Sequence, residues 1–133
     1  NFAAKQMAKM LPKNAVLVPI PGRHGKADQT LHLCRDIASY TCLPVVDALR
    51  GKDRESQYEA KYKGHSLTEE QLGFHKVASI PADRIPYLID NVVDTGTTAK
   101  AAVKALGGGI VLSYAMSDTL LAEKQELRPS FHR

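Results

Sequence analysis

Hydrophobic residues in this chain occur in two arrangements, short continuous runs and runs with a helical period. The continuous runs are bounded by proline, glycine or polar residues, which is typical of buried strands. They predict strands at Ala15 to Ile20, Pro44 to Leu49, Tyr87 to Ile89 and Ile110 to Met116, with a shorter one at Lys76 to Ile80.

The helical periods lie between these runs. They predict helices at Phe2 to Leu11, which Pro12 ends, at Asp28 to about Tyr40, at Thr97 to Leu106 and at Thr119 to Leu127. The buried faces are expected to carry Leu33, Ile37 and Tyr40 in the second helix, and Ala99, Ala102, Val103 and Leu106 in the third. In addition, Ser66-Leu-Thr-Glu69 has a capping-box pattern, which predicts the start of a short helix to about Leu72.

Strands that alternate with helices predict an α/β fold with a doubly wound, mainly parallel sheet and right-handed crossovers. The segment Arg50 to His75 departs from this alternation, because it is dense in charge and has no clear apolar period before the capping box. A polar excursion of this length in a compact domain is usually functional or disordered. We therefore expect a long mobile loop after the second strand.

Composition adds few constraints to this picture. The 133 residues fit a single domain, 1–133, and because the chain begins at Asn1 without a Met it is consistent with a domain excised from a longer protein. A net charge of +4 suits an anionic small molecule as well as nucleic acid. Cys34 and Cys42 form no metal-ligand or redox motif, which indicates reduced thiols and a cytoplasmic protein. No membrane span or signal peptide is visible.

The stretch from Pro86 to Leu106 concentrates the candidate chemistry. Its predicted strand is followed by Asp90, Asn91 and Asp94, and then by Thr95, Gly96, Thr97 and Thr98 at the start of a helix. Open α/β sheets bind ligands beyond the carboxyl ends of their strands. A helix N-terminus suits a phosphate, and the preceding carboxylates suit sugar hydroxyls or Mg²⁺. The alternatives are an ordinary threonine N-cap and an Asp-Asn turn at a strand end.

This stretch resembles the signature of type I phosphoribosyltransferases, in which apolar residues, two acidic residues and two aliphatic residues precede a short Thr/Gly-rich loop and a helix. Leu88 to Thr98 matches the pattern except at Asn91, where the family has a second acidic residue. In layout the chain is similar to the ComF-type, competence-associated branch. Val18-Pro-Ile-Pro21 resembles that branch's loop after the first strand, and Leu49-Arg50 followed by Gln57 resembles its Arg…Gln stretch.

The resemblance implies a ligand, 5-phosphoribosyl 1-diphosphate with Mg²⁺, and a reaction in which a base nitrogen displaces pyrophosphate. It implies that Thr95, Gly96, Thr97 and Thr98 bind the 5′-phosphate, that Asp90 and Asn91 bind the ribose, and that Asp90 also contacts the metal. Asp94 matches a position that handles the proton of the base in the purine-salvage branch, and its alternative role is a loop cap.

The resemblance also implies two cationic segments. The pyrophosphate loop corresponds to Pro21, Gly22, Arg23 and Lys26, and the mobile loop that covers the substrate contains Arg50, Lys52, Arg54 and Gln57. Solvated basic surfaces are the alternative for both segments.

Two function classes stay open at this point. The first is a phosphoribosyltransferase that acts on phosphoribosyl diphosphate and a nucleobase or nucleotide. The second is a non-catalytic binding module with the same pocket and a regulatory, DNA-uptake or repair-associated role, which the missing charge at Asn91 favours. A direct nucleic-acid-binding domain has little support, because the chain has no basic helix, zinc motif or aromatic–basic interleaving. The family often forms homodimers, so a homodimer is possible.

Overall fold

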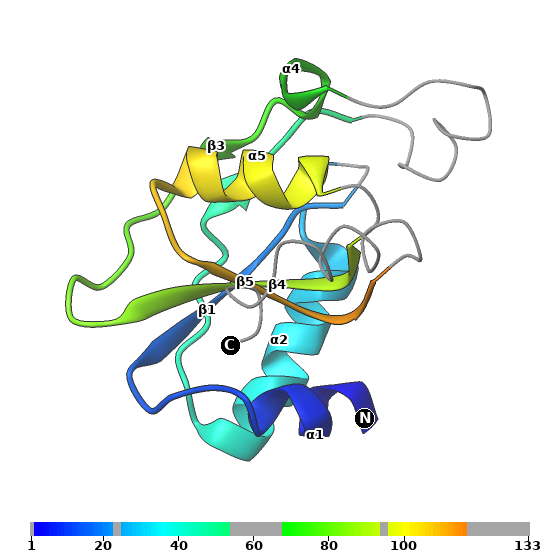
Figure 1. Ribbon diagram of the computed structural model, residues 1–133. Helices are drawn as coiled ribbons and strands as arrows, with labels where there is room; N and C mark the ends of the chain where they lie inside the picture. The colour runs from blue at the N-terminus through cyan, green and yellow to red at the C-terminus, as the bar shows by residue number, and fades with distance from the viewer. Residues whose placement is uncertain (1, 23–24, 54–67, 94–95, 117–133) are drawn as a thin grey trace, which may run out of the picture.

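The computed structural model describes residues 2–22, 25–53, 68–93 and 96–116 of the chain. Its central element is a three-stranded sheet in the order β1-β4-β5 (Figure 1). The strands are β1 (Ala15–Pro19), β4 (Ile85–Val93) and β5 (Ile110–Met116). Both pairings are parallel, with Leu17 opposite Tyr87 and Leu88 opposite Val111. The prediction of a mainly parallel sheet is confirmed.

A fourth segment extends the sheet beyond β1. Val45 forms an isolated parallel bridge with Leu17. The Leu17 N–H donates to the Pro44 carbonyl, and the Val46 N–H donates to the Leu17 carbonyl, both at 2.9 Å. The strand predicted at Pro44 to Leu49 is therefore reduced to a single bridge on this sheet.

The end of that predicted strand belongs to a second, antiparallel sheet. Here β2 (Leu49–Arg50) pairs with β3 (His75–Lys76). The chain turns away from the main sheet after Val46, because Leu49 finds its backbone partner in Lys76, outside the parallel sheet. The strand predicted at Lys76 to Ile80 thus begins one residue earlier and ends at Lys76.

Helices cover both faces of the main sheet, as the doubly wound prediction requires. Figure 1 shows α1 (Phe2–Ala8) and α2 (Asp28–Thr41) on one side and α5 (Thr97–Leu106) on the other. Residues next to each other in a strand point to opposite faces. Accordingly, Leu17 and Ile89 pack with α1 and α2, whereas Val18 and Leu88 pack with α5.

The helices match their predicted positions closely. In α5, Ala102 and Leu106 are buried as predicted, but Ala101 is also buried, whereas Ala99 and Val103 are half-buried.

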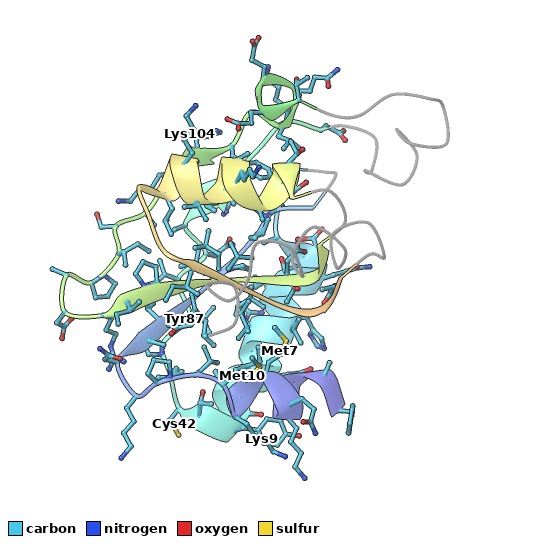
Figure 2. The ribbon with its side chains drawn as sticks, in the orientation of Figure 1. Met7, Lys9, Met10, Cys42, Tyr87 and Lys104 are labelled. Atoms are coloured by element: carbon cyan, nitrogen blue, oxygen red, sulfur yellow. The ribbon has the colours of Figure 1, made fainter. Side chains whose placement is uncertain are left out.

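Three further corrections concern the other helices. The first helix ends at Ala8, and the Met10 N–H bonds to the Met7 carbonyl in a tighter final turn. Met7 is buried against α2, whereas Met10 in this turn is 58% exposed; Figure 2 labels both side chains. The buried face of α2 consists of Thr30, Leu33, Cys34 and Ile37, so Tyr40 lies at the border of this face and is 50% exposed.

The third correction concerns α4 (Glu69–Leu72). Its capping box is formed by Thr68 and Gln71, two residues beyond the predicted Ser66 and Glu69. The Gln71 N–H donates to the Thr68 hydroxyl at 3.2 Å, and the Thr68 N–H donates to the Gln71 side-chain oxygen at 2.8 Å. The helix predicted at 119–127 lies outside the described residues. Within the described part of the chain, no helix is long and apolar enough to cross a membrane.

Candidate functional site

The sheet has a topological switch point between β1 and β4. From β1 the chain continues through α2 to Val45 on one side, and from β4 it continues through α5 to β5 on the other. Ligands of open α/β sheets bind at such a point, beyond the carboxyl ends of the strands. The loop after β1 and the loop after β4 both start at this edge, because the two strands are parallel neighbours. The two predicted phosphate-binding segments are therefore brought together.

The connection from β4 to α5 is short, since only Asp94, Thr95 and Gly96 lie between Val93 and Thr97. Gly96 is the N-cap of α5, with φ 89° and no side-chain cap hydrogen bond. A threonine N-cap, the alternative interpretation of this segment, is therefore not what begins the helix. Thr97 and Thr98 occupy the first turn, where the helix dipole favours an anion.

Asp90 and Asn91 lie within β4, whereas the sequence predicted a strand that ended at Ile89. Asp90 pairs in register with Ser113 of β5 and is half-buried. Asn91 is exposed, and its N–H donates to the Asp90 carboxylate at 2.9 Å. The alternation along a strand places Asp90 on the Leu88 face, toward α5, and Asn91 on the opposite face. Asp90 is thus the one that shares a face with the start of α5.

The loop after β1 is a closed backbone unit. The Gly22 N–H donates to the Lys26 carbonyl, and the Gly25 N–H donates to the Gly22 carbonyl, both at 3.0 Å. Pro21 is buried at its start, whereas Gly22 and Lys26 are exposed. The Lys26 ammonium is therefore available to an anion at this edge, and the backbone that carries it is fixed.

A glycine pair joins this loop to the segment after β2. The Gly51 N–H donates to the Gly25 carbonyl at 3.0 Å. A Cβ at Gly25 would overlap the Gly51 carbonyl, so the approach is possible only because this position has no side chain. Gly25 also has φ +78°, which glycine adopts readily.

The described ends of the predicted mobile loop are tied to each other. The Lys52 N–H donates to the Leu72 carbonyl at 2.9 Å, next to the β2–β3 pair. The Arg50 guanidinium forms a 2.9 Å ion pair with Asp47 and donates to the Leu49 carbonyl at 2.8 Å. Arg50 therefore has local partners, whereas Lys52 is exposed and its aliphatic part lies against Gly73.

Several predicted site residues lie outside the described residues: Arg23, Arg54, Gln57, Asp94 and Thr95. Their roles stay predictions. Sequence analysis, in turn, missed Thr30, Gly25 and Gly51. The hydroxyl of Thr30 is buried and donates to the Ile20 carbonyl at 2.6 Å. A polar residue at helical spacing with Leu33, Cys34 and Ile37 was the available signal for Thr30.

The donor set at this edge is compatible with Mg²⁺ held mainly by a ligand. Among the described residues no group of His, Cys, Asp or Glu side chains could hold a metal by itself. Mg²⁺ is usually bound through one or two carboxylates together with substrate phosphates. Asp90 can supply one such carboxylate, and the phosphates of a ligand would have to supply most of the remaining oxygens.

The thiols do not belong to this site. Burial, with a smaller contribution from the nearby Asp47 carboxylate, raises the pKa of the Cys34 thiol far above its ordinary value. Cys42 is exposed at the carboxyl end of α2, far from α5 (Figure 2). Both cysteines are free thiols in the structure.

Comparison with known proteins gives a fold relationship. No protein-family model and no curated protein matches the chain. Among solved structures, the chain is similar to the allosteric regulatory enzyme of purine biosynthesis, with a TM-score of 0.54 and 17% sequence identity. The likeness shows the fold. It covers 85% of this chain and 24% of the enzyme, so the chain spans about a quarter of that protein's length.

Proposed function

We propose that the chain is a phosphoribosyltransferase-like domain. It binds 5-phosphoribosyl 1-diphosphate and Mg²⁺ and transfers the phosphoribosyl group to a nitrogenous base, with release of pyrophosphate. The observation that carries the proposal is the meeting of two loops at the switch point of a parallel sheet. One loop follows β1 and carries Lys26, and the other follows β4 and leads into the N-terminus of α5.

Each part of the edge suits one part of the proposed ligand. The first turn of α5, with Thr97 and Thr98, favours the 5′-phosphate through backbone N–H groups and the helix dipole. The Asp90 carboxylate, on the same face, can accept hydrogen bonds from ribose hydroxyls. The loop from Pro21 to Lys26 supplies the Lys26 ammonium as a donor for the pyrophosphate. Mg²⁺, when bound, would neutralise part of the pyrophosphate charge.

Residues outside the described part complete the proposal. Arg23 would add a bidentate donor for phosphate oxygens, and Asp94 would accept or return the proton of the base. The mobile-loop residues Lys52, Arg54 and Gln57 would exclude water from the reacting centre. Arg50 is a weaker candidate, because its guanidinium already pairs with Asp47.

The experiment has two measurements. Calorimetry with phosphoribosyl diphosphate and Mg²⁺ should show binding that ribose 5-phosphate reproduces in part, and pyrophosphate release should occur with one member of a panel of bases. Absence of binding to both ligands would refute the proposal. Binding without pyrophosphate release on any base would favour a second candidate, a non-catalytic binding module. The observation behind that candidate is Asn91, which lacks the charge of the second acidic residue.

A charge substitution tests the role of Asn91. Asn91→Asp should strengthen Mg²⁺-dependent binding of phosphoribosyl diphosphate, because it restores a carboxylate at this edge. Asn14→Asp is a matched control, because Asn14 is also exposed and lies just before β1, at the opposite edge of the sheet. If both variants change the affinity equally, net charge is responsible, and Asn91 does not act locally.

A further inference from the structure

The backbone at the start of the loop after β1 has few hydrogen-bonding groups. Pro19 and Pro21 have no amide N–H, so Ile20 is the one residue between them that can donate. The Ile20 N–H donates to the Ile89 carbonyl of β4 at 3.1 Å. The Ile20 carbonyl accepts the Thr30 hydroxyl of α2 at 2.6 Å. The sheet therefore holds the N–H of Ile20, and α2 holds its carbonyl.

Thr30 is an unusual residue for its position. It is 6% exposed and is the one buried polar or charged residue identified among those that the structure describes. It shares the buried face of α2 with Leu33, Cys34 and Ile37. A buried hydroxyl is unfavourable unless it forms a hydrogen bond, and threonine is a poor helix former. Packing alone would be served by an apolar residue, so the specific contribution of Thr30 is its bond to Ile20.

The hydrogen bond of Thr30 fixes the Ile20 carbonyl at the start of the loop. The far end of the loop is held separately, because the Gly51 N–H donates to the Gly25 carbonyl, so Thr30 acts on the residues next to Ile20, which are Pro21 and Gly22. The first turn of α5 follows β4, whereas Thr30 bonds to the residue that follows β1. A change at Thr30 should therefore reach one phosphate-binding segment and leave the other in place.

We propose that Thr30 is a positioning residue for the pyrophosphate group, acting through the Ile20 carbonyl on Pro21 and Gly22 at the start of the loop. The inference rests on the proposed function, because it requires a ligand that carries a pyrophosphate at this loop and a second phosphate at α5.

Two ligands separate this role from a general structural one. Phosphoribosyl diphosphate contacts both segments, whereas ribose 5-phosphate lacks the pyrophosphate. Thr30→Val keeps the shape of the side chain and removes the donor. It should weaken binding of phosphoribosyl diphosphate with Mg²⁺ by about tenfold, because the loss of one hydrogen bond that positions the loop changes affinity by about this factor. Binding of ribose 5-phosphate should stay unchanged. Thr30→Ser keeps the donor and should restore the affinity for phosphoribosyl diphosphate.

Ile37→Val is the matched control, because Ile37 lies on the same buried face of α2 and contacts the core. It should destabilise the protein without changing the ratio of the two affinities. The positioning role is wrong if Thr30→Val lowers the affinity for both ligands equally or changes neither affinity. It is also wrong if Thr30→Ser does not keep the wild-type affinity for phosphoribosyl diphosphate. If Thr30→Val does not fold, Thr30→Cys replaces it, and its weaker S–H donor should give an intermediate loss. An unchanged affinity in Thr30→Cys would then overturn the inference.

Binding of the two ligands to the wild-type protein separates the role of Thr30 from the proposed function. Equal affinity for the two ligands would refute a pyrophosphate-binding loop, and with it the role of Thr30, but would leave the phosphate site at α5 intact. Failure to bind either ligand would refute the proposed function itself.

Discussion

The contact between Gly25 and Gly51 makes a quantitative prediction about stability. It joins the loop after β1 to the segment after β2, and it depends on the absence of a side chain at Gly25. In Gly25→Ala the new Cβ would overlap the Gly51 carbonyl oxygen and lie 2.9 Å from the carbonyl carbon. Both are backbone atoms, so no side-chain rotation can relieve the overlap. One of the two segments must move.

The magnitude follows from two separate costs. Gly25 has φ +78°, and a non-glycine residue in this region costs about 1–2 kcal/mol. Overpacking against a fixed group adds about 1–3 kcal/mol. Gly107→Ala isolates the first cost, because Gly107 has φ +96° and nothing lies within 4 Å of its added Cβ. The free energy of unfolding should therefore fall further in Gly25→Ala than in Gly107→Ala, by about 1–3 kcal/mol.

Urea unfolding followed by far-ultraviolet circular dichroism measures this difference, since the chain has no tryptophan to report by fluorescence. The dependence of the free energy on urea should stay the same in the two variants, which would show that the unfolded states are comparable. Equal destabilisation would mean that the Gly25 loop relaxes freely away from Gly51. That result would refute the coupling between the loop after β1 and the segment after β2.

Two further predictions use the same kind of matched comparison. Ile89→Ala should lower the free energy of unfolding by about 2–5 kcal/mol, because Ile89 is fully buried. Ile110→Ala should lower it much less, because Ile110 is 42% exposed. Similar urea midpoints for the two variants would contradict the burial of Ile89 in the core. Stability should also fall as pH rises above about 9.0, the ordinary thiol pKa, because unfolded Cys34 ionises while the raised pKa of folded Cys34 keeps it protonated. Cys34→Ala should remove this part of the pH dependence, and an identical stability profile in the variant would refute it.

The elements that could be predicted well are those whose signals are local. The helix Thr97–Leu106 was predicted with its observed ends, because a glycine precedes it, an apolar face runs through it and Gly107 ends it. The two parallel pairings also follow from strand–helix alternation. At the candidate site, the same local signals identified the start of α5 and the loop after β1.

The errors arose where partners distant in sequence decide the structure. Leu49 left its predicted strand because it pairs with Lys76, and β4 continues through Asp90 because that residue pairs with Ser113. The capping box was ambiguous for a different reason. Ser66 with Glu69 and Thr68 with Gln71 both satisfy the local pattern, so the sequence alone did not decide between them. The Gly25–Gly51 approach has no local signal at all.

The alternation along β4 also changes the meaning of Asn91. Asp90 faces α5, whose N-terminus suits the 5′-phosphate, whereas Asn91 faces the side of the sheet covered by α2. Within the proposed function, a carboxylate at position 91 would act through Mg²⁺, which the phosphates of the ligand help to hold. Asn91→Asp should then strengthen binding of phosphoribosyl diphosphate with Mg²⁺ and leave ribose 5-phosphate unaffected, the inverse of the selectivity expected for Thr30→Val.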